Sequence, residues 1–109
     1  MLAKKYRLPS RARVGNGLFL SCSELNVKIS QNGLSFNRFS VIVSKKIDKR
    51  ATVRNRIRRL IYAVVGEIFQ KSKKGLDILF IIKRAAVGKS KKDFYVIIES
   101  LLKKAGFLN

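Results

Sequence analysis

The chain has 109 residues, with 25 Lys and Arg against six Asp and Glu, which gives a formal net charge of +19 at pH 7. Hydrophobic residues make up 47% of it, a share that excludes a disordered basic tail and predicts a single folded domain over residues 1–109. The lone Cys22 excludes an intramolecular disulfide and favours a cytoplasmic location, and no apolar run approaches the roughly 18 residues of a membrane span. So high a charge indicates a polyanionic partner, with nucleic acid favoured over a membrane surface.

The amino-terminal segment, residues 1–17, is basic and weakly patterned. Pro9 and the glycines Gly15 and Gly17 limit any helix there to about two turns, and Ser10 is a suitable cap for it. We therefore expect a short first helix.

Two strands are predicted next, over residues 17–22 and 25–30. In the second of them apolar and polar residues alternate strictly, which is typical of a strand with one buried and one solvent-facing side. The expected buried side consists of Leu25, Val27 and Ile29, and the solvent-facing side of Asn26, Lys28 and Ser30.

A third strand is predicted over residues 38–45, after a turn. The dipeptide Asn32-Gly33 favours a tight hairpin, because both residue types tolerate positive φ. The core-facing residues of this strand are expected to be Phe39, Val41 and Val43. Leu34 and Phe36 fall in the opposite phase, so we expect a bulge near Asn37.

A long amphipathic helix is predicted over about residues 51–70, with Asp48 or Thr52 as its cap. Its apolar stripe consists of Val53, Ile57, Leu60, Ile61, Val64 and Ile68. Residues 77–83 follow as a strand whose unbroken apolar run indicates burial on both faces, as in an interior parallel strand.

The last predicted element is a helix that begins at a capping box formed by Ser90 and Asp93 and ends at Gly106. Its apolar stripe consists of Phe94, Ile97, Ile98, Leu101 and Ala105. A weak helix, three strands, a helix, a strand and a helix predict an α+β domain in which helices pack on one sheet.

The long helix carries an arginine collar, defined as Arg54, Arg56, Arg58 and Arg59, around Asn55. Cations near a helix amino terminus oppose the helix dipole and cost about 0.3–1 kcal/mol each at low salt. Phosphate, in contrast, binds both the free N–H groups of that terminus and guanidinium groups. The collar therefore favours a nucleic-acid phosphate site over the alternative of an ordinary solvated face, because few acids balance it.

The chain offers little for catalysis of its own. It has no histidine, and it has no phosphate-binding loop and no paired cysteines for zinc. The six acids are scattered at Glu24, Asp48, Glu67, Asp77, Asp93 and Glu99. We predict no catalytic residue and no metal site on this chain.

The segment that runs from Val43-Ser44-Lys45-Lys46 to Ala51-Thr52-Val53-Arg54-Asn55-Arg56-Ile57-Arg58-Arg59-Leu60 resembles the signature of the bacterial ribonuclease P protein subunit. Residues 75–86 and 101–106 are similar to that family's last strand and closing helix. The resemblance implies a single α-β-β-β-α-β-α domain, with helices packed on a four-stranded sheet. It also implies a left-handed βαβ crossover between the strands at 38–45 and 77–83, where a right-handed one is the default.

The resemblance implies a function as well. In this family the RNA subunit removes the 5′ leader of precursor tRNA by Mg²⁺-dependent hydrolysis, with the metal held mainly by RNA, while the protein binds the catalytic RNA and the leader. The implied contacts with catalytic RNA are Lys45, Lys46, Arg50, Arg54, Asn55, Arg56, Arg58 and Arg59. The implied leader contacts are Phe19, Asn26, Lys28 and Ser30. No obligate protein partner is expected.

The first segment departs from the family, because it lacks the two aromatics usual there and Lys28 replaces an aromatic on the second strand. We therefore expect leader binding to be more electrostatic and less dependent on stacking. The alternatives are a structural RNA-binding protein of ribosomal type and a DNA-binding module, although the sequence has no helix-turn-helix signal.

Overall fold

The computed structural model describes residues 17–68 and 74–107, so the short helix expected within residues 1–17 lies outside the described residues. The elements follow the predicted order. They are β1 (Leu18–Ser21), β2 (Leu25–Gln31), β3 (Arg38–Ile42), α1 (Ala51–Ile68), β4 (Leu76–Ile82), the short 3-10 helix η3 (Arg84–Ala86) and α2 (Lys91–Lys104). The fold is α+β, as predicted.

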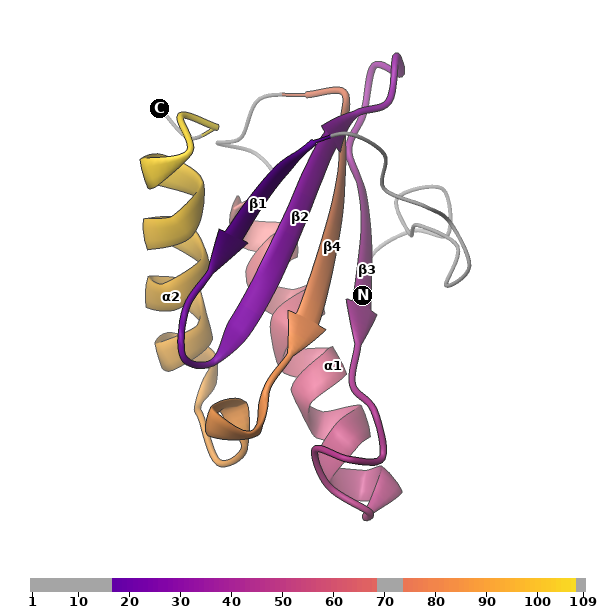
Figure 1. Ribbon diagram of the computed structural model, residues 1–109, viewed down its shortest axis with the longest axis vertical. Helices are drawn as coiled ribbons and strands as arrows, with labels where there is room; N and C mark the ends of the chain where they lie inside the picture. The colour runs from indigo at the N-terminus through magenta and orange to yellow at the C-terminus, as the bar shows by residue number, and fades with distance from the viewer. Residues whose placement is uncertain (1–16, 69–73, 108–109) are drawn as a thin grey trace.

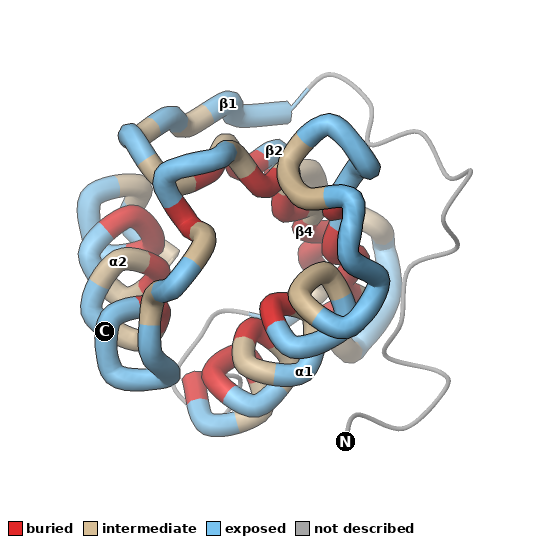
Figure 2. The backbone as a smooth tube through the Cα atoms, turned by 90° about the horizontal axis from the view of Figure 1, so that it is seen from below, coloured by how far each residue is buried: buried red, intermediate tan, exposed pale blue. Residues whose placement is uncertain are grey.

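One mixed sheet carries the structure, with strand order β1-β2-β4-β3. The pairs β1–β2 and β2–β4 are antiparallel, and β3–β4 is parallel. Both helices lie on the same face of the sheet, and the buried residues face each other between the two layers (Figure 2). In Figure 1, β3 and β4 both point downward with α1 behind them, and β4 lies to the left of β3. The β3–α1–β4 crossover is therefore left-handed, as the resemblance implied.

The predicted hairpin between β2 and β3 is wrong, because β4 lies between these two strands. The turn itself forms: Gly33 has a φ of 72°, and the Asn32 side chain accepts a hydrogen bond from the N–H of Leu34 at 2.7 Å. The N–H of Asn32 also donates to the carbonyl oxygen of Gly75 at 2.9 Å. The turn thus begins a connection across the end of β4, whose apolar run takes the predicted interior position. The expected burial on both faces is only partial, because both helices lie on one face and Leu79 and Ile81 on the other face are half-buried.

The bulge expected near Asn37 is also absent from the described pairing, since β3 runs in unbroken register with β4 from Arg38 onward. The phase change belongs instead to the loop before β3. Asn37 ends this loop fully buried, and its side-chain oxygen accepts from the N–H of Leu76 at 2.8 Å.

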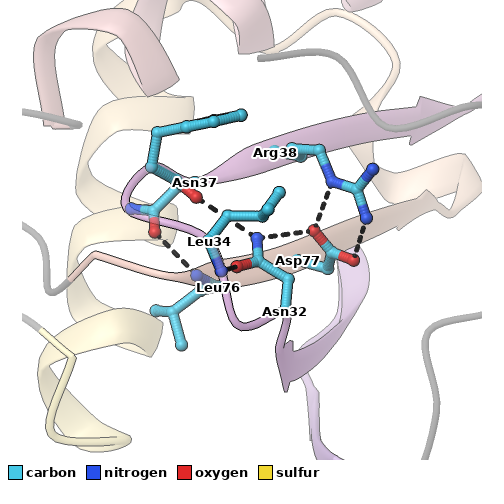
Figure 3. Close-up of polar contacts among 7 residues, drawn as sticks. Asn32, Leu34, Asn37, Arg38, Leu76 and Asp77 are labelled. Atoms are coloured by element: carbon cyan, nitrogen blue, oxygen red, sulfur yellow. Dashed lines mark hydrogen bonds and ion pairs between the residues drawn. The ribbon is translucent and has the colours of Figure 1, made fainter. Parts of the chain in front are cut away.

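A polar staple, defined as Asn32, Arg38 and Asp77, joins the residue after β2 to β3 and β4 beside this loop (Figure 3). Arg38 donates to both carboxylate oxygens of Asp77, at 2.9 and 2.8 Å, and Asn32 Nδ2 donates to the same carboxylate at 2.9 Å. Asp77 is almost fully buried, so these donors replace the water that burial removes.

The helices pack with most of the predicted stripes, but Val53, Leu60 and Ile97 are only half-buried and Ala105 lies just beyond the end of α2. Val65 and Leu102 are buried instead, outside the predicted stripes. In α1 the buried residues are Ile57, Ile61, Val64, Val65 and Ile68, and in α2 they are Phe94, Ile98, Leu101 and Leu102. The capping box of Ser90 and Asp93 is present. Thr52 lies inside α1 and caps nothing, whereas Asp48 accepts from the N–H of Arg50 in the turn that precedes the helix. None of the helices within the described ranges is long and apolar enough to cross a membrane.

Candidate nucleic-acid interface

The basic signature segment gathers at one end of the sheet. It comprises the first turns of α1 and the connection that leads from β3 to α1. We call this connection, residues 43–50, the lysine loop. Because β3 and β4 are parallel, both strands end here, and η3 follows β4 at the same edge (Figure 1). The side chains of Lys45, Lys46 and Lys49 are exposed on this loop.

Two arginines of the collar hold the lysine loop against α1. Arg54 Nη1 donates to the carbonyl oxygens of Asp48 and Lys49, at 3.0 and 2.9 Å. Arg58 Nη2 donates to the carbonyl oxygen of Val43 at 3.3 Å. Both side chains are half-buried, so they fix the loop as well as add charge.

The other two arginines of the collar, Arg56 and Arg59, are exposed. Neither forms a hydrogen bond or ion pair with another residue of the described ranges. Asn55 is exposed between the two groups, and its side-chain oxygen accepts from Arg58 Nη1 at 2.9 Å, which leaves its Nδ2 group as a donor. The collar is therefore divided into a positioning pair and a solvent-facing pair.

Asp48 and Arg50 form a two-point ion pair within the lysine loop. Arg50 donates through Nε at 3.1 Å and through Nη2 at 2.9 Å, and its main-chain N–H adds a third bond to the same carboxylate. The hydrogen bonds from Arg50 lower the pKa of Asp48 to about 2, so this carboxylate stays charged near neutral pH. Arg50 is thus already engaged with an acid and is not a free cation like Lys45 and Lys46.

The expected leader residues lie on the face of the sheet opposite the helices. Phe19 pairs with Lys28, and Lys28 pairs with Leu79, so these three side chains form a row across β1, β2 and β4. Phe19 is 53% exposed, and Lys28 is exposed beside it. Asn26 and Ser30 are half-buried in neighbouring rows; the side-chain oxygen of Asn26 accepts from the hydroxyl of Ser21 at 2.7 Å.

The family model for ribonuclease P matches residues 3–106 of this chain. The chain belongs to the ribonuclease P protein family. It is therefore a subunit of the ribonuclease P ribonucleoprotein, an endoribonuclease that matures the 5′ ends of tRNA.

Relatives agree with this membership. The ribonuclease P protein component of Clostridium kluyveri is 37% identical over 98 residues, which cover 88% of this chain and 87% of that protein. The component of Synechocystis is 36% identical over 73 residues, which cover 67% of this chain and 59% of that protein. Among solved structures, a Staphylococcus aureus RNase P protein mutant with defective mRNA degradation activity has a TM-score of 0.85 at 25% identity, over 96% of this chain and 92% of that one.

One residue of this ribonuclease P protein's basic end was missed by sequence reasoning. Arg84 directly follows β4, and its Nε donates to the carbonyl oxygen of Lys46 in the lysine loop at 3.3 Å. The signal was present in the implied parallel pairing, which brings the residues after both strands to one edge. Taken alone, Lys83-Arg84 is an ordinary charged pair at the end of a strand and does not indicate a binding residue.

Proposed function

We propose that this ribonuclease P protein binds the catalytic RNA of its holoenzyme through the basic end of the molecule. Arg56 and Arg59 on α1 and Lys45 and Lys46 on the lysine loop contact phosphates, and the Nδ2 group of Asn55 donates to the RNA between them. The observation that carries this proposal is that Arg56 and Arg59 are exposed and have no partner among the described residues, in a chain of charge +19.

Arg50, Arg54 and Arg58 contribute to the same surface mainly by positioning it. Each has bonds to the lysine loop, but a guanidinium group carries five N–H donors, so further donors remain for RNA. Their contact with the catalytic RNA, implied by the resemblance, stays a prediction.

The cations at the basic end of the molecule suit a folded RNA better than DNA. The deep major groove of an RNA helix is closed to side chains, so recognition depends on phosphates, 2′-hydroxyls and shape. A set of cations at fixed positions recognises shape, and the release of counterions supplies much of the affinity.

We further propose that the face of the sheet opposite the two helices binds the 5′ leader of precursor tRNA. Phe19 offers an exposed ring for stacking on an unpaired base, and Lys28 offers a cation for the adjacent phosphate. Asn26 and Ser30, one row away on each side, supply weaker polar contacts because they are half-buried.

Bond cleavage in this proposal belongs to the RNA subunit, which also binds most of the Mg²⁺. The carboxylates of Asp48, Glu67, Asp77, Asp93 and Glu99 already have protein partners, and a hydrogen bond from Ser23 lowers the pKa of Glu24. This supports a chain with no catalytic residue of its own. We propose that the chain acts in the cytoplasm, where bacterial precursor tRNA is made.

The test combines the chain with its cognate catalytic RNA and precursor tRNA at low Mg²⁺. We expect stimulated cleavage at the correct 5′ position, and no cleavage by the protein without that RNA. Arg56→Ala should reduce the slope of log affinity against log salt by about 1, since one phosphate contact is lost. Lys104→Ala removes the same charge from the end of α2, at the opposite end of the molecule, and should leave the slope unchanged (Figure 1). Equal slopes for both variants, or no stimulation of cleavage, would contradict the proposal.

A further inference from the structure

An open depression lies between the lysine loop and the connection from β4 to α2. Its volume is about 550 Å³. Its lining consists of Lys45, Lys46, Ile47, Asp48, Lys49, Arg50, Arg84 and Val87. It therefore extends the basic end of the molecule beyond α1, onto a wall that contains Arg84.

The charge of this lining is strongly positive. Five cations face one carboxylate, which leaves a formal charge of +4. That carboxylate, Asp48, is 15% exposed and is already bound by Arg50 at two points. The side chains of Lys45, Lys46 and Lys49 have no acidic partner among the described residues, and the same is true of Arg84.

Hydrogen bonds to main-chain atoms fix both walls of the depression. Arg84 Nε holds the carbonyl oxygen of Lys46, and Arg54 holds the carbonyls of Asp48 and Lys49. The Nη1 and Nη2 groups of Arg84 are left as donors, because only its Nε is used within the described structure. The cations are thus held near one another before any ligand arrives, which lowers the entropy cost of binding.

The shape and the charge together indicate the class of ligand. Small-molecule sites are enclosed and mostly apolar, whereas this depression is open and lined mainly by charged groups. An excess of four positive charges is more than one small anion neutralises, and a concave basic surface focuses potential on a chain of anions.

We propose that this depression binds a phosphodiester segment of RNA, with the guanidinium of Arg84 as a phosphate contact. The proposal rests on the RNA-binding function proposed above and deepens it. It adds Arg84 and Lys49 to the RNA surface, and it places RNA backbone between the lysine loop and η3 as well as along α1. The phosphodiester can come from the catalytic RNA or from precursor tRNA.

The experiment measures the affinity of Arg84→Ala at several salt concentrations in two arms. One arm measures binding of the protein to catalytic RNA alone, and the other measures binding of precursor tRNA to the holoenzyme. We expect affinity to fall roughly 5-fold at 0.15 M salt and the log-log slope to fall by about 1 in one arm. That arm identifies the RNA that supplies the phosphate, and unchanged slopes in both arms overturn the proposal.

Arg84→Lys separates charge from structure. It keeps the cation but loses the planar group that donates to Lys46, so the wild-type slope should persist even if thermal unfolding shows a less stable loop. If the two Arg84 variants lose affinity equally with unchanged slopes, Arg84 is only structural and the proposal fails. Arg56→Ala, measured in parallel, distinguishes the two proposals: a reduced slope there with none for Arg84→Ala overturns this site alone, and no change in either overturns both.

Discussion

Arg58 of α1 donates through Nη2 to the main-chain carbonyl of Val43, at 3.3 Å, and so closes the lysine loop at the point where it leaves β3. Arg54, one turn earlier, holds the carbonyls at the other end of the same loop. The loop that carries Lys45 and Lys46 is therefore bound at both ends by arginines of the helix that follows it. Half of the arginine collar therefore positions the lysines in addition to providing charge.

The first prediction concerns Arg54. Arg54→Ala should lower the free energy of unfolding by about 1 kcal/mol, because two charge-assisted hydrogen bonds to half-buried or exposed loop carbonyls are lost. Arg54→Lys should lower it almost as much, since an ammonium cannot reproduce the planar donor geometry. Urea denaturation measures both.

Arg59→Ala is the matched control, since Arg59 is exposed on the same helix and has no partner in the described structure. Its unfolding free energy should stay within about 0.5 kcal/mol of wild type while its salt slope for RNA binding falls. The division of the collar would be refuted by equal losses of stability in Arg54→Ala and Arg59→Ala.

The spacing of the four arginines predicts that the collar divides into two pairs, but it does not predict which pair contacts the protein. Residues four apart, such as Arg54 and Arg58, share one flank of a helix, and residues three apart, such as Arg56 and Arg59, share another. Periodicity therefore predicts two pairs as well as the apolar stripe. Which pair meets the protein depends on the path of an irregular loop, and hydrophobic periodicity carries no information about that path.

In the sheet, too, local sequence patterns predict the elements but not the contacts between distant residues. The alternation of residues 25–30 correctly predicts the buried side of β2, although on the other side only Lys28 is exposed and Asn26 and Ser30 are half-buried. The apolar run at 78–82 correctly predicts the interior position of β4. Asn32-Gly33 is a local signal for a turn, and the turn forms, but it says nothing about which strand lies beyond it. The crossing over β4 depends on contacts between distant residues, such as the bond from Asn32 to Gly75.

A second prediction concerns the polar staple and pH. Burial raises the pKa of the Asp77 carboxyl, but hydrogen bonds from Arg38 and Asn32 lower it more, and the net pKa lies below its ordinary value of 3.8. Such a group stabilises the fold above its unfolded pKa, and this contribution is lost as the pH falls through the folded pKa. Asp77→Asn should therefore lower stability by about 2 kcal/mol near neutral pH and make it less dependent on pH below about 4.

Urea denaturation of both proteins between pH 2 and pH 7 checks this. Other acids of the chain also titrate at low pH, so the relevant quantity is the difference between the two profiles. A constant difference across the whole range would mean that the charge of Asp77 does not contribute through the staple.

A third prediction concerns the start of α2. The hydroxyl of Ser90 accepts from the N–H of Asp93 at 3.2 Å, and the Asp93 carboxylate accepts from the N–H of Ser90 at 2.9 Å. Ser90→Ala should lower the free energy of unfolding by about 1 kcal/mol, because an N–H of the first turn loses its acceptor. Ser100→Ala, at an exposed position inside the same helix, should be neutral or slightly stabilising, since alanine favours helix. Equal effects in thermal or urea denaturation would exclude a capping role.

The last prediction concerns Asp48, the one acid in the basic depression. Asp48→Asn keeps a side-chain oxygen for the main-chain N–H of Arg50 but removes the charge that binds its guanidinium. The local charge rises by one and Arg50 becomes available to phosphate, so binding to catalytic RNA should tighten and its log-log salt slope should steepen by up to about 1. Glu99→Gln raises the net charge equally on α2, away from the depression, and should change the slope much less. If the two variants change the salt slope equally, only net charge matters and Arg50 does not contact RNA. If Asp48→Asn weakens binding, the ion pair itself shapes the surface that RNA recognises.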